Sequence, residues 1–266
     1  MDENAPTEMV QVKRIKRVLV KTAATLARQD ARHLVDAYYA VQRRRESAEA
    51  QFQRATDGDQ PHQLIAWLAN QDLIVEKQIK RVLDEWSDTL AAARWAKSII
   101  GVGPVIAAGL ATHIDISRCR TVGQLWRFAG YDPTLKWAPG TRCPWNRQLK
   151  RICWLAGESF VTTAGHPDGF YGQLYLLRQR AEQERNEVGP DQLPPDQIHL
   201  RSKRWAVKLF LAHYHHVAWV AATGMEPPTP YAIEILGRGG FVAPPNFQQQ
   251  PTGEGCHASN VRSARR

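Results

Sequence analysis

The chain has 266 residues, of which 43% are hydrophobic and 23% are charged, enough for one large domain or two modest ones. This composition is ordinary for a globular protein and excludes a chain that is disordered throughout. The 35 Lys and Arg against 26 Asp and Glu give a net charge of +9, which favours a polyanionic partner without identifying it.

The predicted elements are all helical, beginning with two long helices. Neither glycine nor proline interrupts residues 7–57 or residues 62–100, and apolar side chains recur there every three or four positions. The spacing predicts helices at about 11–55 and 62–98. Such long helices are typical of an antiparallel hairpin or a coiled coil. We therefore expect residues 11–97 to form a long helical hairpin through which the chain makes homo-oligomers.

Shorter helices separated by frequent turns are predicted after residue 98. A stretch containing three prolines, residues 187–198, is expected to be a surface loop. The glycine, proline and glutamine content beyond residue 222 predicts a tail that is mostly disordered. The expected order is a flexible segment 1–10, the hairpin 11–97, a compact helix-hairpin-helix domain 98–222 and a tail 223–266. The shorter helices are predicted at 104–113, 121–130, 146–164, 168–186 and 199–222.

The cysteines and the N-terminal residues bear on where the protein works. Cys119, Cys143, Cys153 and Cys256 are widely spaced and form no Cys-x-x-Cys pair, which indicates a reducing compartment rather than a disulfide scaffold. The first residues lack a signal-peptide pattern, and the longest uncharged run, residues 98–114, contains three glycines and a proline. We expect a cytoplasmic, nucleoid-associated protein with no membrane partner.

A turn with two glycines separates two of the predicted helices. Gly101-Val102-Gly103-Pro104 is typical of a helix-hairpin-helix, in which glycines allow the backbone to approach a phosphate. Amide N–H groups and the positive end of the second helix would then bind that phosphate without reading base sequence. The alternative is a plain corner in which the glycines permit close packing.

Residues 118–154 carry most of the excess charge. They contain eight Lys and Arg against one acid, together with four tryptophans. Cations interleaved with large rings are typical of a groove that holds a nucleic-acid backbone and unstacked bases. We expect Trp126 and Trp154 to belong to the core. Trp137 and Trp145, which flank a proline-containing loop, are expected to be exposed.

Three other groups are better explained by structural roles. The triplet at residues 43–45 is interpreted as a solvated charged face, with a nucleic-acid contact as the alternative. His213, His215 and His216 lack the paired spacing of a metal site, so we expect no metal. Ser159 has no evident base and is interpreted as a packed hydroxyl. No phosphate-binding loop is present, and we expect no cofactor.

Several segments, taken in order, resemble one known family. Gly101-Val-Gly-Pro-Val-Ile-Ala-Ala-Gly109 is followed by Ile114-Asp-Ile-Ser-Arg118, by Gln124-Leu-Trp-Arg-Phe-Ala-Gly-Tyr-Asp-Pro133 and by Asn146-Arg-Gln-Leu-Lys-Arg151. This order resembles the C-terminal domain of the DEDD-plus-serine insertion-sequence transposases, the family that includes bridge-RNA-guided recombinases. With further similarity at 170–175 and 203–209, the resemblance covers about residues 97–222.

The resemblance implies a DNA-binding protein of a mobile genetic element, with structured RNA as a further partner. Two departures limit what it implies about catalysis. Residues before 97 do not show the acid-bearing strands of the family's RNase H-like domain, whose four acids bind metal. The loop that holds the family's nucleophilic serine corresponds to residues 134–145, which contain no serine. Thr141 and Cys143 are weak substitutes, because the first suits a turn and the second an inert thiol.

We therefore predict a nucleic-acid-binding protein that lacks its own nuclease chemistry. One alternative is an active transposase or recombinase that works with an RNase H-like subunit from another chain. A second alternative is a helical scaffold for protein partners. The predicted nucleic-acid-binding residues are Lys97, Gly101, Val102, Gly103, Arg127, Trp137, Arg142, Trp145, Arg147, Lys150, Arg151, Lys203, Arg204 and Lys208.

Overall fold

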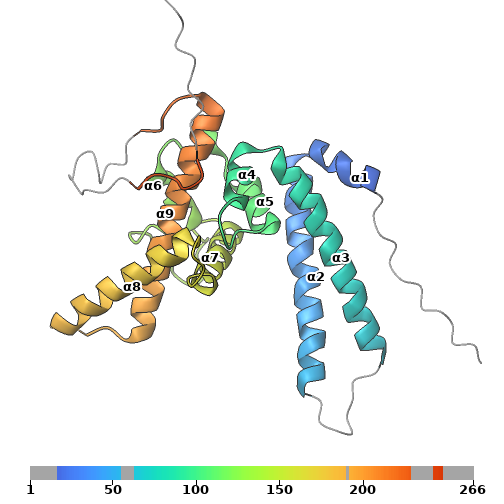
Figure 1. Ribbon diagram of the computed structural model, residues 1–266, viewed down its shortest axis with the longest axis horizontal. Coiled ribbons are helices and arrows are strands. Elements are labelled where there is room, and N and C mark those ends of the chain that lie inside the picture. Colours follow the sequence, from blue (N-terminus) through green and yellow to red (C-terminus); the bar gives the residue numbers. More distant parts are fainter. Residues whose placement is uncertain (1–16, 55–62, 190–191, 229–241, 248–266) are drawn as a thin grey trace, which may run out of the picture.

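The computed structural model confirms the predicted all-α fold. It describes residues 17–54, 63–189, 192–228 and 242–247, and within these ranges every regular element is a helix. Two long antiparallel helices project from one side of a body formed by the helices that follow them (Figure 1). We call these two helices, α2 (Arg28–Arg54) and α3 (Gln63–Asp88), the arm.

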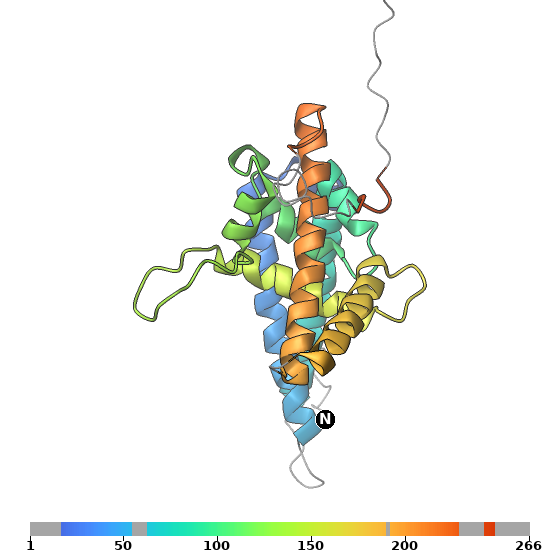
Figure 2. The same cartoon turned by 90° about the vertical axis from the view of Figure 1, so that its left-hand side faces the viewer.

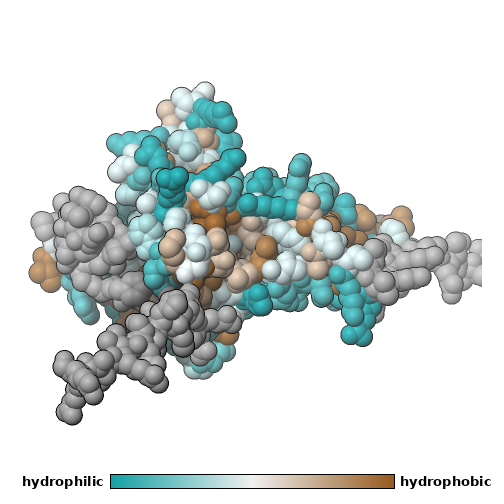
Figure 3. Space-filling model, turned by 90° about the horizontal axis from the view of Figure 1, so that it is seen from above, coloured by the Kyte–Doolittle hydropathy of each residue, from teal (hydrophilic) through white to brown (hydrophobic). Residues whose placement is uncertain are grey.

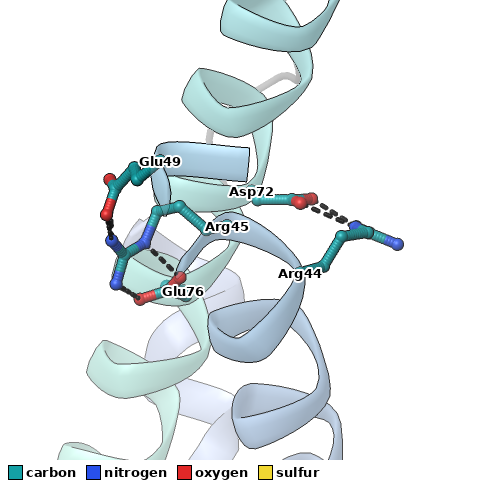
Figure 4. A network of polar contacts seen from close by, with 5 residues as sticks. All are labelled: Arg44, Arg45, Glu49, Asp72 and Glu76. Carbon is teal, nitrogen blue, oxygen red and sulfur yellow. Dashed lines mark hydrogen bonds and ion pairs between the residues drawn. The ribbon is translucent and has the colours of Figure 1, made fainter. Parts of the chain in front are cut away.

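The arm is held by apolar contacts near the body and by ion pairs farther out. Val35 of α2 and Leu83 and Trp86 of α3 are buried in one apolar cluster. Farther along, the Arg45 guanidinium donates to Glu76, with Nε 2.6 Å from Oε1, and also to Glu49 (Figure 4). The predicted hairpin therefore forms within one chain, while oligomerisation stays a prediction.

The arginine triplet is not a solvated face as a whole. Arg44 pairs with the buried carboxylate of Asp72, and Arg45 pairs with Glu76, whose side chain is only 7% exposed. Arg43 alone of the three is exposed with no ion pair in the described structure. The solvated interpretation is wrong for Arg45, because its guanidinium forms an ion pair with the buried carboxylate of Glu76 on the neighbouring helix.

Both predicted long helices are broken at corners that carry no glycine or proline. The first is described from Arg17 and divides into α1 (Arg17–Lys21), a 3-10 turn (Thr22–Thr25) and α2. Leu26 ends the 3-10 turn with an extended backbone, and Trp86 Nε1 donates a hydrogen bond to its carbonyl oxygen at 3.1 Å.

The second break separates α3 from α4 (Ala91–Lys97), because Leu90 is extended. Here the Thr89 hydroxyl donates back to the Trp86 carbonyl at 2.7 Å. Side-chain hydrogen bonds from Trp86 and Thr89 thus replace the turn residues that usually mark a helix end.

A short, almost wholly apolar helix joins the arm to the body. α5 (Pro104–His113) matches its predicted bounds, and Pro104 occupies its first turn. Val105 and Ala108 pack into the arm, whereas Ala107 and Leu110 belong to the main core of the body. Because α5 is buried on both sides, it fixes the arm relative to the rest of the chain.

The body consists of four further helices around that core. α9 runs the length of the body with α8 beside it (Figure 2). Leu125, Leu149, Tyr171 and Phe210, one from each helix, are each at most 1% exposed and belong to the same core. The helices are α6 (Val122–Ala129), α7 (Arg147–Thr162), α8 (Phe170–Val188) and α9 (Pro195–Thr223).

The loop predicted at 187–198 is shorter than expected. α8 extends to Val188, and α9 already begins at Pro195, whose missing N–H is not needed in a first helical turn. The Asn186 side chain exchanges two hydrogen bonds with the backbone of Leu193, which closes the loop.

Within the tail predicted to be mostly disordered, residues 242–247 are attached to the body. Trp95 Nε1 donates to the Pro245 carbonyl at 2.7 Å, and His213 Nε2 donates to the Val242 carbonyl at 2.7 Å. These hydrogen bonds attach the segment to α4 and α9, and no composition signal predicts them. The prediction for 229–241 and 248–266, like that for 1–10, lies outside the described residues.

Most of the described surface is hydrophilic in the view from above, where apolar residues gather in a band across the middle (Figure 3). None of the described helices combines the length and the hydropathy that a bilayer span requires.

The ion pairs of the arm give a stability prediction. Arg45→Ala leaves the buried Glu76 carboxylate unpaired, so we expect a loss of about 3 kcal/mol in the free energy of unfolding. The control is Arg118→Ala, because Arg118 is 85% exposed and pairs with Asp115 at 3.5 Å, an arrangement worth less than about 1 kcal/mol. Urea unfolding measures both variants. Equal losses in the two would contradict the role assigned to the arm ion pairs.

Candidate nucleic-acid interface

The start of α7 is fixed by a single asparagine. Asn146 Oδ1 accepts the Leu149 N–H at 3.0 Å and thereby caps the helix. Its side-chain amide lies 3.3 Å from His113 Nδ1, and its backbone N–H donates to the Phe128 carbonyl at 2.9 Å. The first turn of α7 is therefore tied to the ends of α5 and α6, and the loop of residues 131–146 before it projects from the body (Figure 2).

Three cations of α7 and α9 lie together beside this first turn. Lys150 Nζ is 4.0 Å from the ring centre of Trp145, and Lys208 Nζ is 4.0 Å from that of Trp126. Arg204 is exposed on α9, one turn before Lys208, and its charge acts on both lysines. We call Lys150, Arg204 and Lys208 the basic cluster.

The basic cluster is electrostatically unfavourable in the free protein. Burial lowers the pKa of Lys150, and the charge of Arg204 lowers it further. Burial also lowers the pKa of Lys208, where Asp132 opposes the shift and Arg204 adds to it. Among the described residues no carboxylate lies within 4.0 Å of any of the three cations. At Lys208 the Asp132 carboxylate outweighs the repulsion from Arg204, whereas at Lys150 the repulsion from Arg204 outweighs the opposing effect of Cys143.

Further cations extend the basic cluster in two directions. At one end Arg127 lies 3.9 Å from Asp132 and is 63% exposed. At the other end the Arg147 guanidinium lies 5.2 Å from the ring centre of Trp137, and Arg142 lines the same open pocket as Arg147. The predicted residues Arg127, Trp137, Arg142, Trp145, Arg147, Lys150, Arg204 and Lys208 therefore lie along α6, α7, α9 and the projecting loop.

The structure places three other predicted cations differently. Lys97 forms ion pairs with Asp84 and Asp88 at 2.5 and 2.7 Å, far along the chain from the basic cluster. Lys203 borders the cluster, but its ammonium pairs with Glu158 and its side chain is only 9% exposed.

Arg151 lies on the side of α7 that faces the arm. Its guanidinium is 5.0 Å from the ring centre of Tyr39 in α2. It lines a pocket with Arg43 rather than with the cations of α9. Arg151 directly follows Lys150 in the sequence. Consecutive side chains of a helix point in different directions, so the two cations lie on different faces of α7.

The glycine corner packs internally. Gly101 has a φ of +94°, and a Cβ there would lie 2.9 Å from Ser159 Oγ on α7. Ser159 itself donates to the Gly101 carbonyl, which confirms the packed hydroxyl, and Val102 is 5% exposed. Gly103 precedes the first turn of α5. The close approach that requires a glycine at 101 is therefore to α7, and these three residues do not join the basic cluster.

The two weak catalytic candidates differ in their surroundings. Thr141 closes a turn through its hydroxyl, which donates to the Ala138 carbonyl at 2.7 Å. Cys143 is half-buried; desolvation raises the pKa of its thiol, but hydrogen bonds from Trp145 and Arg147 and the charges of Arg147 and Lys150 outweigh this and lower it. The neighbouring cations therefore favour the thiolate form of Cys143, while its inertness stays a prediction.

Two tryptophans depart from their predicted places. Trp145, expected to be exposed, is half-buried. Trp154, expected in the core, is 49% exposed on α7 one turn after Lys150. It lines a cavity of about 110 Å³ between α7 and α9. The heptad-like spacing of α7 could have shown this, because Leu149, Ile152, Cys153 and Ala156 form its buried face and leave 154 outside it.

The predicted histidine group serves packing. The Tyr171 hydroxyl lies 2.7 Å from His213 Nδ1, and His215 Nε2 donates to the Cys119 carbonyl at 2.7 Å. His216 lies 3.2 Å from Glu226. In the described ranges no three His, Cys, Asp or Glu side chains are grouped as metal ligands would be.

Comparison with protein-family models, curated proteins and solved structures finds no match for this chain.

Alanine substitutions at two glycines with positive φ test whether Gly130 supports the positions of Trp145 and Lys150. A Cβ at Gly130 (φ +75°) would lie 2.8 Å from the Trp145 ring and 3.0 Å from the Lys150 side chain, whereas a Cβ at Gly140 (φ +82°) meets nothing. Gly140→Ala should lose about 1 kcal/mol from backbone strain alone. Gly130→Ala should lose about 2–4 kcal/mol, because overpacking adds to the strain. Urea unfolding compares them, and equal losses would show that Gly130 does not support Trp145 and Lys150.

Proposed function

We propose that the protein binds nucleic acid, and DNA in particular, through the sugar–phosphate backbone. The observation that carries this is the basic cluster, in which Lys150, Arg204 and Lys208 lie together without a carboxylate ion pair in the described structure. A polyanion that bridges the three cations would remove their mutual repulsion. The net charge of +9 supports the same class of partner.

The geometry favours backbone contacts over base reading. The cations come from the sides of α7 and α9, and their ammonium groups rest on rings that hold them at the surface. The projecting loop adds Arg142 and an exposed Trp137 to the same side. Such contacts position a nucleic acid without specifying its sequence.

The wider role rests on the resemblance of residues 97–222 to the transposase C-terminal domain. We propose a transposase-like DNA-binding protein of a mobile genetic element that does not supply its own nuclease chemistry. Structured RNA is a further partner consistent with a surface that contacts phosphates.

Salt dependence tests the proposed function. Each neutralised phosphate releases counterions, so affinity for a duplex should fall steeply as salt rises. A plot of the logarithm of the binding constant against the logarithm of the salt concentration should have a slope of about −0.9 per phosphate contact. Arg204→Ala and Lys208→Ala should each weaken binding and reduce that slope by about one contact. Fluorescence anisotropy at several salt concentrations measures the slope.

Arg118→Ala is the matched control, since Arg118 is an exposed cation outside the basic cluster. It should leave affinity and slope nearly unchanged. A wild-type affinity that does not vary with salt, or equal effects of Arg118 and Arg204 variants, would contradict the proposal.

A second candidate function is strand cleavage together with an RNase H-like subunit from another chain. The observation in its favour is Cys143, whose thiol lies beside the positive charges of Arg147 and Lys150. A thiolate stabilised in this way is a nucleophile. Thr141 is less suited, because its hydroxyl is already engaged with the Ala138 carbonyl.

Incubation with supercoiled plasmid and Mg²⁺, with and without an RNase H-like protein from a neighbouring gene, separates the two candidates. For a binding protein we expect no nicking in either reaction. Nicking that Cys143→Ala abolishes, and that Cys153→Ala leaves intact as the control for a buried thiol, would establish the catalytic candidate instead.

A further inference from the structure

We propose that the basic cluster and Trp154 together bind an unpaired nucleotide, so that the surface prefers single-stranded nucleic acid over a duplex. This inference rests on the proposed function and adds the class of nucleic acid. It concerns the ring of Trp154, which is 49% exposed.

Trp154 is placed as a stacking platform. It is 49% exposed and lies on α7 one helical turn after Lys150, so the two side chains are neighbours on one face. The ring borders the cavity between α7 and α9, whose walls also include Tyr131, Leu200 and Arg204. An apolar ring and a cavity thus adjoin two of the three cations.

The other tryptophans near the basic cluster already have partners. The rings of Trp145 and Trp126 each carry a lysine ammonium at 4.0 Å. Trp137 lies on the projecting loop against Arg147. Lys203 is farther from the Trp154 ring, at 5.4 Å, and its charge is directed to Glu158. Trp154 is therefore the ring of this group best placed to receive a base.

The expected preference for single strands follows from the base faces that each form of nucleic acid exposes. In a duplex the bases are paired and stacked on one another, so their faces cannot reach a side chain. In a single strand each base has a free face, and stacking on an aromatic side chain contributes about 1–3 kcal/mol. A base on Trp154 would leave its phosphates beside Lys150 and Arg204, which the cavity brings to the same edge.

The test compares single strands with a duplex. The probes are oligothymidylate and oligouridylate of about 12 nucleotides and a DNA duplex of similar length, measured by fluorescence anisotropy with the full chain. Trp154→Ala should weaken binding of the single strands about 10-fold and change duplex binding less than about twofold. Trp154→Phe should restore most of the loss.

Leu177→Ala is the control for removing an exposed apolar side chain, since Leu177 is 59% exposed on α8. Arg204→Ala should weaken single strands and duplex alike. A loss of affinity for either oligothymidylate or oligouridylate that is not seen with the duplex supports the inference. Comparison of the two oligonucleotides shows whether the sugar matters.

Three results would overturn it. Trp154→Ala could leave single-strand binding intact, or weaken single strands and duplex equally. It could also change the sedimentation mass of the protein, which would place Trp154 at a contact between copies. Duplex binding without single-strand binding would refute the inference while the proposed function stands, and no binding to any probe would refute both.

Discussion

Partial burial of two lysines beside an exposed arginine, with Asp132 as the carboxylate that acts on Lys208, is the constraint that shapes the candidate site. Lys150 and Lys208 are each held against a tryptophan, and Arg204 lies near enough to lower the pKa of both. A fold gains little stability from such an arrangement, because cation–ring contacts are worth about 0.5–1 kcal/mol at exposed sites. A polyanion beside these cations would make the arrangement more favourable, which is the basis of the proposed function.

The rest of the fold fixes the two helices that carry these charges. α5 is buried between the arm and the body, and its last residue, His113, contacts Asn146 at the start of α7. Trp126 Nε1 donates to the Lys208 carbonyl at 3.0 Å, which ties α6 to α9 beneath the same ammonium group. Displacing α5 would therefore move Lys150 as well as the arm.

Local sequence signals predicted the elements better than their assembly. Pro104 and the glycines before it predicted the start of α5, and the start predicted for α7 at residue 146 is one residue from the observed Arg147. The corners at Leu26 and Leu90 could not be predicted, because hydrogen bonds from distant or local side chains replace turn residues there. The attachment of residues 242–247 depends on Trp95 and His213, which lie far away in sequence.

The candidate site was also predicted only in part, because it too depends on contacts between segments that are distant in the sequence. Composition located the basic stretch, but charge alone could not show which cations have acidic partners. Lys97 and Lys203 are neutralised by carboxylates of α3 and α7, and Arg151 points to the arm. Arg204 and Lys208 approach Lys150 only because α9 crosses α7, a contact between segments some 50 positions apart in the sequence.

The most direct measurement is an NMR titration of the lysine side chains of Lys150 and Lys208, with and without a bound oligonucleotide. If the basic cluster is an uncompensated anion site, both pKa values should lie below the ordinary lysine value of about 10.5 in the free protein and rise when the oligonucleotide binds. Ordinary values in the free protein that stay unchanged on addition of the oligonucleotide would contradict this explanation of the site.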